Sequence, residues 1–239
     1  MIKAVTFDLW FTLIWLDNEV YRRYTLRRLS VIKKYFLKAG LDADYDFIQN
    51  VYNRVAHYRM RIRVEKFLRL LLEEANLSLD NDEFRNFVKE YNEIAVEVNP
   101  YLNSEAPEIL RYLKERGIKV GVITNTSFSG DSLIKMLEKL GIAKYIDVLV
   151  SSCDVEALKP DEKIFRVTLS QLGEKAGNAM HIGDNYDDDV LGAKRVGMHA
   201  ALYRGLWDKY EDYMVTWRKY DKDNSIIIID NLIELAKYI

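Results

Sequence analysis

Near its amino terminus the chain reads Ala4-Val5-Thr6-Phe7-Asp8-Leu9-Trp10-Phe11-Thr12-Leu13, an apolar, β-branched run that contains a single acid. A run of this kind is typical of a short parallel strand that is buried on both faces. In open α/β sheets, ligands bind just beyond the carboxyl ends of the strands. Asp8 would stand at such an end, either as a turn residue bonded to nearby backbone or as a reactive group.

The composition of the chain excludes several classes of protein. Its 239 residues, 49% of them hydrophobic, suffice for one large domain or two smaller ones. Lys and Arg total 35 against 37 for Asp and Glu, so we expect no nucleic-acid partner and no membrane surface. A single cysteine, Cys153, excludes a disulfide framework within one chain. We expect neither a signal peptide nor a membrane span, and therefore a cytoplasmic protein.

From about Asn18 to about Val98 the apolar residues recur at helical spacing, with no proline and only one glycine. Three apolar stripes indicate a small helical bundle. The first stripe is expected to comprise Tyr21, Tyr24, Leu29, Ile32, Phe36 and Leu37. Asn99-Pro100 ends the bundle, because the residue before a proline is displaced from the helical region.

From Ser104 onward, helical segments alternate with short apolar segments. The pattern predicts strands at 118–123, 148–150, 179–182, 199–203 and 226–229. Alternation of this kind is typical of the α/β class, in which a parallel sheet carries helices on both faces. Because the strand before Asp8 belongs to the same sheet, the helical block is an insertion between the first two units of the core.

Polar residues follow four of these strands. Asp8 follows the first strand and Thr124-Asn125 the second, Lys159 lies in a loop after the third, and Gly183-Asp184 begins an acidic run after the fourth. Each has an ordinary explanation by itself, as a helix cap, a surface lysine or acids near a helix N-terminus. The carboxyl ends of parallel strands meet at one edge of a sheet, so together these groups predict one catalytic pocket.

This ordered set of residues resembles the haloacid dehalogenase-like (HAD) hydrolase superfamily, most of whose members are phosphatases. The four motifs of that family correspond to residues 8–13, 124–125, 159 and 183–189, so the resemblance covers the whole chain. It implies a Rossmann-like, doubly wound core of residues 1–15 and 100–239. Residues 16–99 would form the inserted α-helical cap of the C1 type.

The resemblance also implies a metal-dependent covalent mechanism. Asp8 would attack phosphorus and form an aspartyl-phosphate, which water then hydrolyses. Mg²⁺ would be bound by Asp8, the backbone carbonyl of Trp10 and Asp184, and Asp189 would support it directly or through water.

Other residues would then bind the substrate, a small phosphorylated molecule. Lys159 would hold Asp8 and one phosphoryl oxygen, and Thr124 would hold another. The further residues expected to contact the substrate are Trp10, Thr12 and Asn125.

The chain departs from the phosphatase pattern at two positions. Trp10 stands where phosphatases of the family carry a second aspartate as general acid and base, and such help is worth about 10²–10⁴ in rate. Phe11 replaces the usual glycine and adds bulk beside the nucleophile.

Three interpretations therefore stay open. The first is a Mg²⁺-dependent phosphatase whose proton comes from the substrate, from water or from the cap. The second is a 2-haloacid dehalogenase, in which Asp8 attacks carbon, displaces halide and needs no metal. The third is a non-catalytic binding protein on a HAD scaffold. The intact Asp184 favours the first, because dehalogenases usually carry a small neutral residue there and clustered acids without a cation repel one another.

Four arginines of the cap segment alternate with apolar residues, at positions 54, 59, 61 and 63. A solvated helix surface explains this alternation. Arg59 and Arg63 would share a helix face, which makes them candidates for pairing with a substrate carboxylate or a second phosphate. The Trp- and Tyr-rich segment from Gly205 to Ser225 fits either a homodimer contact or a partly buried helix.

Overall fold

The computed structural model describes residues 1–209 and 226–239. Within these residues, six parallel strands form one sheet in the order β5-β4-β1-β6-β7-β8. The strands are Ala4–Phe7 (β1), Lys119–Thr124 (β4), Val148–Ser151 (β5), Ala179–Gly183 (β6), His199–Tyr203 (β7) and Ile227–Ile229 (β8). The α/β class is confirmed, and the predicted strands end within one residue of the observed ones. Most of the segment from Gly205 to Ser225, for which a homodimer contact or a partly buried helix was expected, lies outside the described residues.

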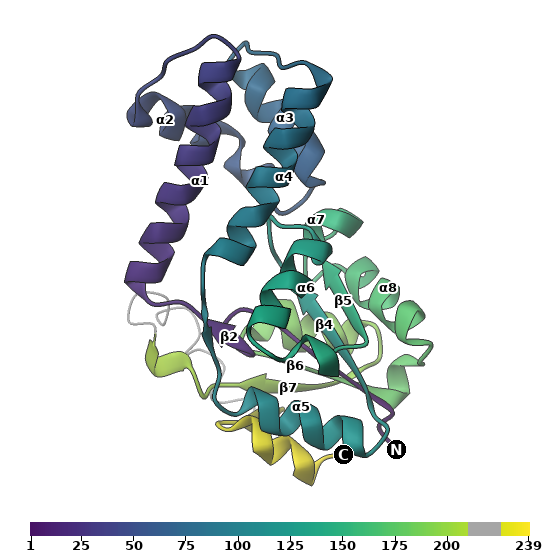
Figure 1. Cartoon of the computed structure of the whole chain (residues 1–239). Coiled ribbons are helices and arrows are strands. Elements are labelled where there is room, and N and C mark those ends of the chain that lie inside the picture. Colours follow the sequence, from purple (N-terminus) through teal and green to yellow (C-terminus); the bar gives the residue numbers. More distant parts are fainter. Residues whose placement is uncertain (210–225) are drawn as a thin grey trace.

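Helices cover both faces of this sheet (Figure 1). On one face lie α5 (Ala106–Glu115) and α6 (Gly130–Lys139), together with the closing 3₁₀ helix Leu232–Lys237. The other face carries α8 (Glu162–Leu172) and the short α9 (Gly192–Arg195). Because β1 and β6 are covered on both sides, all their residues are buried, as the continuous apolar runs of the sequence predict.

The register of the central strands brings the predicted motifs together. Phe7 of β1 is paired with Val122 of β4 on one side and with Ile182 of β6 on the other. The backbone N–H of Asp8 continues this ladder by donating to the carbonyl of Ile182 at 2.8 Å. The residues that follow β1, β4 and β6 therefore emerge at one edge of the sheet.

Four helices form a separate helical unit beyond the sheet (Figure 1). Three of them begin at aspartates whose carboxylates accept hydrogen bonds from first-turn N–H groups, namely Asp17, Asp44 and Asp80. The helices are α1 (Asn18–Lys38), α2 (Tyr45–Val55), α3 (Val64–Glu74) and α4 (Asn81–Glu97). None of the described helices is both long and apolar enough to cross a membrane.

The apolar stripe predicted for α1 is wrong at its two ends. Tyr21 and Leu37 are 59% and 55% exposed, whereas Tyr24 and Tyr35 are buried. The buried face is set by the partner helix, because the ring of Tyr35 stacks on Phe87 of α4 with centroids 4.5 Å apart. Helical spacing alone does not show which side of a wide apolar surface meets that partner.

A two-stranded ribbon connects the helical unit to the core. β2 (Ile14–Trp15), before α1, is antiparallel to β3 (Tyr101–Leu102), after α4. The rings of Trp15 and Tyr101 stack with centroids 4.5 Å apart. The sequence pattern did not predict this pairing, since each strand has only two residues.

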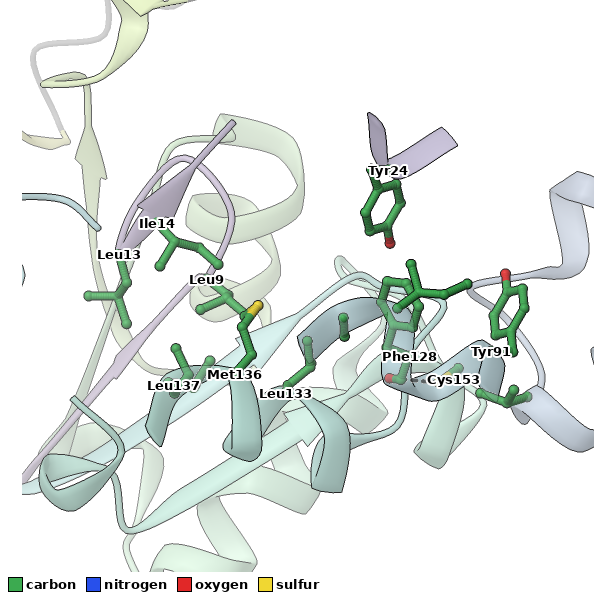
Figure 2. Close-up of a cluster of buried hydrophobic side chains, with 14 of the residues drawn as sticks. Leu9, Leu13, Ile14, Tyr24, Tyr91, Phe128, Leu133, Met136, Leu137 and Cys153 are labelled. Atoms are coloured by element: carbon green, nitrogen blue, oxygen red, sulfur yellow. Dashed lines mark hydrogen bonds between the residues drawn. The ribbon is translucent and has the colours of Figure 1, made fainter. Parts of the chain in front are cut away.

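The interiors of the helical unit and of the core are continuous. Figure 2 shows Tyr24 of α1 and Tyr91 of α4 meeting Phe128, which follows β4. The same apolar cluster continues along α6 through Leu133 and Met136 toward the residues after β1 (Figure 2). α4 also lies along α6, so the helical unit contacts the core over an extended surface.

Candidate active site

A buried lysine joins the first and fourth motifs at the edge of the sheet. The ammonium of Lys159 donates to Oδ1 of Asp8 and, at 2.6 Å, to Oδ1 of Asp189. Lys159 is 4% exposed, Asp8 6% and Asp189 1%, so these ion pairs are shielded from water. Burial of this kind is costly for a single charge, and the opposite charges offset that cost. The predicted convergence of Asp8 and Lys159 is thus observed.

Two residues of the strands behind the site hold Asp189 in place. His181 of β6 lies 3.0 Å from Oδ1 of Asp189 through Nε2, and 2.8 Å from the hydroxyl of Thr6 through Nδ1. Burial lowers the pKa of His181, which makes the ring neutral. Because a carboxylate can only accept, Nε2 carries the proton and Nδ1 accepts from Thr6.

Gly183 provides the space that Asp189 occupies. A Cβ at position 183 would lie 2.1 Å from the carboxyl carbon of Asp189. The second oxygen of that carboxylate accepts from the backbone N–H of Asn185 at 2.9 Å. A side chain at 183 would therefore displace the acid that supports Lys159.

Asn125, predicted to contact the substrate, fixes the loop of Lys159. Its side-chain oxygen accepts from the backbone N–H of Lys159 at 2.8 Å, and its amide donates to the carbonyl of the same residue at 3.1 Å. The amide also reaches a carboxylate oxygen of Asp188 at 3.4 Å. This amide therefore connects the second, third and fourth motifs.

The two predicted threonines are both fully buried. Thr124 stands at the end of β4, and its hydroxyl has no hydrogen-bond partner among the described residues. A buried hydroxyl in this state retains a donor for an incoming group. The hydroxyl of Thr12 is likewise unpartnered within the described chain, while its carbonyl accepts from Asn103 at 2.8 Å.

The site holds more negative than positive charge. Burial, with the neighbouring Asp189, raises the pKa of Asp8 to about 7 even though Lys159 opposes the shift. Burial raises the pKa of Asp184 well above its usual range, and the charges of Asp8 and Asp189 raise it further. Asp8, Asp184 and Asp189 thus lie together with the ammonium of Lys159, and their negative charges repel one another.

The loop after Asp8 departs from ordinary backbone geometry. Phe11 has a φ of +67°, in the left-handed region that favours glycine. Its N–H donates to the carbonyl of Ile14 at 2.6 Å, which closes a tight turn. Trp10, the residue before it, is half-buried and packs against the main apolar cluster.

The arginines predicted to bind an anion do not share a helix face. Arg59 and Arg63 lie in the connection between α2 and α3, where the helical pattern is interrupted after Tyr58. Arg59 is half-buried and donates to the carbonyl of Ala56 at 3.3 Å, whereas Arg63 is exposed. The buried arginine of the helical unit is Arg28, which the sequence pattern did not single out.

The match to a known family is extensive. The sequence model of the haloacid dehalogenase-like hydrolases matches residues 2–197. The chain belongs to this family. The matched residues include Asp8, Lys159 and Asp184, which the fold brings to one edge of the sheet.

Individual relatives of this HAD hydrolase carry different names. The chain is 28% identical over 229 residues to glyceraldehyde 3-phosphate phosphatase of Methanocaldococcus jannaschii, covering 90% of this chain and 93% of the relative. It is 30% identical over 99 residues to ribulose-1,5-bisphosphate 5-phosphatase of Halopiger xanaduensis, covering 41% of each. The chain thus spans less than half of that second relative.

Solved structures show the same fold. A HAD phosphatase from Thermococcus onnurineus superposes with a TM-score of 0.61 at 26% identity, covering 99% of this chain and 97% of that one. A 2-haloacid dehalogenase from Pseudomonas syringae superposes with a TM-score of 0.69 at 23% identity, covering the same shares. At that identity the second likeness concerns the fold of this HAD hydrolase alone.

Proposed function

We propose that this HAD hydrolase is a Mg²⁺-dependent phosphatase that acts on a small phosphorylated metabolite. The observation that carries the proposal is the cluster of acids at this edge of the sheet, where Asp8 and Asp189 share the buried ammonium of Lys159 and Asp184 lies near enough to feel their charges. Carboxylates clustered in this way favour a bound cation. A 2-haloacid dehalogenase needs no metal and usually carries a small neutral residue at the position of Asp184.

The residues fit Mg²⁺ by their chemistry. Among the described residues, no three acidic, histidine or cysteine side chains are arranged to hold a metal by themselves. Mg²⁺ needs less, because it is usually bound by one or two carboxylates together with waters and substrate phosphate. Asp8, the carbonyl of Trp10 and Asp184 would hold it, and when bound it would neutralise charge on the transferred phosphoryl group.

We assign Asp189 a positioning role rather than a place at the metal. Both of its carboxylate oxygens already accept hydrogen bonds, Oδ1 from Lys159 and His181 and Oδ2 from the Asn185 N–H. Removing Lys159 would leave this buried charge without an opposite charge, and removing either other donor would leave a buried oxygen with fewer hydrogen bonds. Asp189 therefore serves to orient the ammonium that holds Asp8.

The covalent step follows from how Asp8 is held. Lys159 binds Oδ1, so the second oxygen is the one that attacks phosphorus. The bond between phosphorus and the leaving oxygen breaks, and the alkoxide takes a proton from water because the indole of Trp10 does not supply one. A water molecule then attacks phosphorus, releases inorganic phosphate and restores the Asp8 carboxylate. The free hydroxyl of Thr124 and the Lys159 ammonium would stabilise the phosphoryl oxygens.

Two further assignments belong to this proposal. Residues 16–99, which contain α1–α4, would act as the helical cap over a small-molecule substrate. The names of the relatives support this substrate class, since those relatives are phosphatases of sugar phosphates.

The test is hydrolysis of p-nitrophenyl phosphate and of L-2-chloropropionate in parallel, each with Mg²⁺ and with EDTA. We expect phosphate release that EDTA abolishes, no chloride release, and loss of turnover in Asp8→Asn. Chloride release that ignores EDTA would instead establish a dehalogenase. Inactivity on both compounds and on a panel of phosphorylated sugars would support a non-catalytic scaffold.

A further inference from the structure

A pair of polar side chains lies in the middle of the otherwise apolar central strands. Thr6 of β1 and His181 of β6 stand directly opposite each other in the register, and both are fully buried. The hydroxyl of Thr6 lies 2.8 Å from Nδ1 of His181. Polar groups buried in this way cost free energy unless they are hydrogen-bonded to each other. An apolar pair would fill the same space without that requirement.

The neighbouring residues hold both side chains in one orientation. On its other side Thr6 stands opposite Gly121 of β4, and a Cβ at Gly121 would lie 2.9 Å from Cγ2 of Thr6. The ring of Phe165, on α8, meets the ring of His181 at 88°, with centroids 5.2 Å apart. The methyl group of Thr6 therefore lies beside the glycine, and its hydroxyl meets the imidazole.

The imidazole extends these contacts to the reactive end of the sheet. Nε2 of His181 lies 3.0 Å from Oδ1 of Asp189, and the same oxygen accepts from the ammonium of Lys159 at 2.6 Å. Lys159 also donates to Oδ1 of Asp8. The hydrogen bonds thus begin at Thr6 and end at Asp8, two residues later, where side chains of a strand return to the same face. We call these five residues the Thr6–Asp8 network.

The position of each proton in the network follows from the chemistry of its groups. Asp189 is paired with the Lys159 ammonium and only accepts, so Nε2 of His181 carries the proton. Nδ1 is then an acceptor, and the hydroxyl of Thr6 is its donor. An apolar side chain at position 6 would leave Nδ1 buried without this donor.

We propose that Thr6 and His181 are positioning residues for the attack of Asp8 on phosphorus. The inference rests on the proposed phosphatase function. The two residues fix the carboxylate of Asp189, and this carboxylate directs the Lys159 ammonium to Oδ1 of Asp8. Oδ2 of Asp8 therefore remains the attacking oxygen in a fixed orientation. Precise placement matters, because a displacement of about 1 Å can lower a rate by about 10²-fold.

Two substitutions at position 6 separate this role from packing. Thr6→Val retains the shape of the side chain and removes the hydroxyl, whereas Thr6→Ser retains the hydroxyl and removes the methyl group beside Gly121. With p-nitrophenyl phosphate and Mg²⁺, we expect Thr6→Val to lower kcat and kcat/KM together by about 5- to 10-fold, with KM unchanged. Thr6→Ser should recover most of kcat while losing stability to urea, because it leaves a small cavity.

Thr168→Val is the matched control. Thr168, on α8, is fully buried, and a Cβ at Gly121 would lie 3.3 Å from its Cγ2, so its methyl group flanks the same glycine. Its hydroxyl donates to the carbonyl of Ile164 at 2.9 Å. The control thus removes a buried hydroxyl that does not belong to the Thr6–Asp8 network. It should lower stability to urea and leave kcat unchanged.

Two amides at position 181 test which nitrogen of the imidazole acts on Asp189. The amide nitrogen of glutamine can take the place of Nε2, whereas the shorter asparagine reaches only the place of Nδ1. We expect His181→Gln to retain more kcat than His181→Asn. Thr6→Val should cause no further loss in the His181→Gln protein, because Thr6 acts through the imidazole. The Thr6 variants decide the question if the His181 variants do not fold.

Nitrogen NMR of the imidazoles gives a readout that does not depend on turnover. The chain has three histidines, and His57 and His199 are exposed, so substituting these two assigns the remaining signals to His181. We expect a protonated Nε2 and an unprotonated Nδ1 in the wild-type protein. The Nδ1 resonance should move in Thr6→Val and stay in place in Thr168→Val.

Each failure has a distinct meaning. If Nδ1 carries the proton, or if Thr6→Val keeps the kcat of the wild type, the positioning role is overturned while the phosphatase proposal stands. If Thr6→Ser or Thr168→Val lowers kcat as much as Thr6→Val does, packing is responsible and the positioning role is again overturned. If the wild-type protein hydrolyses neither p-nitrophenyl phosphate nor any of a panel of phosphorylated sugars, both proposals are overturned.

Discussion

In the proposed phosphatase mechanism, Trp10 stands where a carboxyl group would protonate the leaving alcohol. Its half-buried indole packs against the apolar cluster and has no proton to transfer at physiological pH. A proposed phosphatase with this residue depends on the leaving group itself. Esters of acidic alcohols, such as p-nitrophenol, should react much faster than alkyl phosphates.

Restoring the acid should therefore change the substrate dependence. We expect Trp10→Asp to raise kcat for glycerol 3-phosphate by about 10²-fold, the lower end of what general acid catalysis supplies. The rate with p-nitrophenyl phosphate should rise far less, because nitrophenolate leaves without a proton. Trp10→Asn provides the control, since it matches the size of aspartate and lacks its acidity. Equal rates for the two variants would contradict the assigned role of position 10.

Phe11 carries backbone strain beside the nucleophile. Its φ of +67° is unfavourable for any residue with a Cβ, by roughly 1–2 kcal/mol. Phe11→Gly and Phe11→Ala both remove the half-buried ring, and only glycine adopts this φ freely. We expect the free energy of unfolding to be about 1 kcal/mol higher for the glycine variant than for the alanine variant. Urea denaturation of both would show it, and equal stabilities would mean that the turn relaxes.

At the level of the elements, α1 and α4 are joined by ion pairs. Arg27 binds Glu97, Lys34 binds Glu90 and Lys38 binds Glu83. The three pairs run along the antiparallel helices and are partly exposed. Each such pair contributes only about 0.2–1 kcal/mol at neutral pH.

The pair at Glu97 should make stability depend on pH in a definite direction. The hydrogen bond from Arg27 holds the pKa of Glu97 below its usual value of 4.5. A lowered pKa in the folded protein stabilises it above the unfolded pKa, and this contribution is lost as the pH falls through the folded value. The stability difference between wild type and Glu97→Gln should therefore be about 0.2–1 kcal/mol at pH 7, shrink as the pH falls below 4.5, and be lost once the pH is below the lowered pKa of folded Glu97. A difference that stays constant with pH would exclude this pair as its source.

The strands, and the polar residues that follow them, were predictable because both can be recognised in short stretches of sequence. A buried parallel strand reads as an apolar run, and parallel strands must end at one edge, so Asp8, Lys159 and Asp184 could be brought together without coordinates. The roles of His181 and Arg28 could not. His181 supports Asp189 and is itself oriented by Thr6, while Arg28 contacts tyrosines of its own helix and of a neighbouring one, and such long-range contacts leave no periodic pattern. Arg59 and Arg63 do not share a helix face, because the helical pattern is interrupted after Tyr58, and no proline or glycine in the sequence marks that interruption.

At the scale of the whole molecule, the helical unit and the core share one apolar interior. Tyr24 and Tyr91 meet Phe128 across the boundary, and Lys66 of α3 forms an ion pair with Glu156 of the core at 2.6 Å. The hydroxyl of Ser152 also donates to the carbonyl of Met60 at 2.8 Å. Parts joined by such contacts unfold together.

We therefore expect one thermal transition by differential scanning calorimetry, with equal calorimetric and van't Hoff enthalpies. Phe128→Ala removes the ring at the boundary and should lower stability by about 3–5 kcal/mol. If the coupling rests on this ring, the transition of the variant should broaden or divide. Two separate transitions in the wild-type protein would contradict a shared interior.

The ribbon of β2 and β3 has a consequence for how this architecture diversifies. It holds together the two points at which the chain leaves the core and returns to it, with Ile14 opposite Leu102 and Trp15 opposite Tyr101. Residues 16–100, which lie between β2 and β3, are therefore inserted between two strands that are already paired. The core sheet can thus keep its register if this inserted segment is replaced by one of a different length.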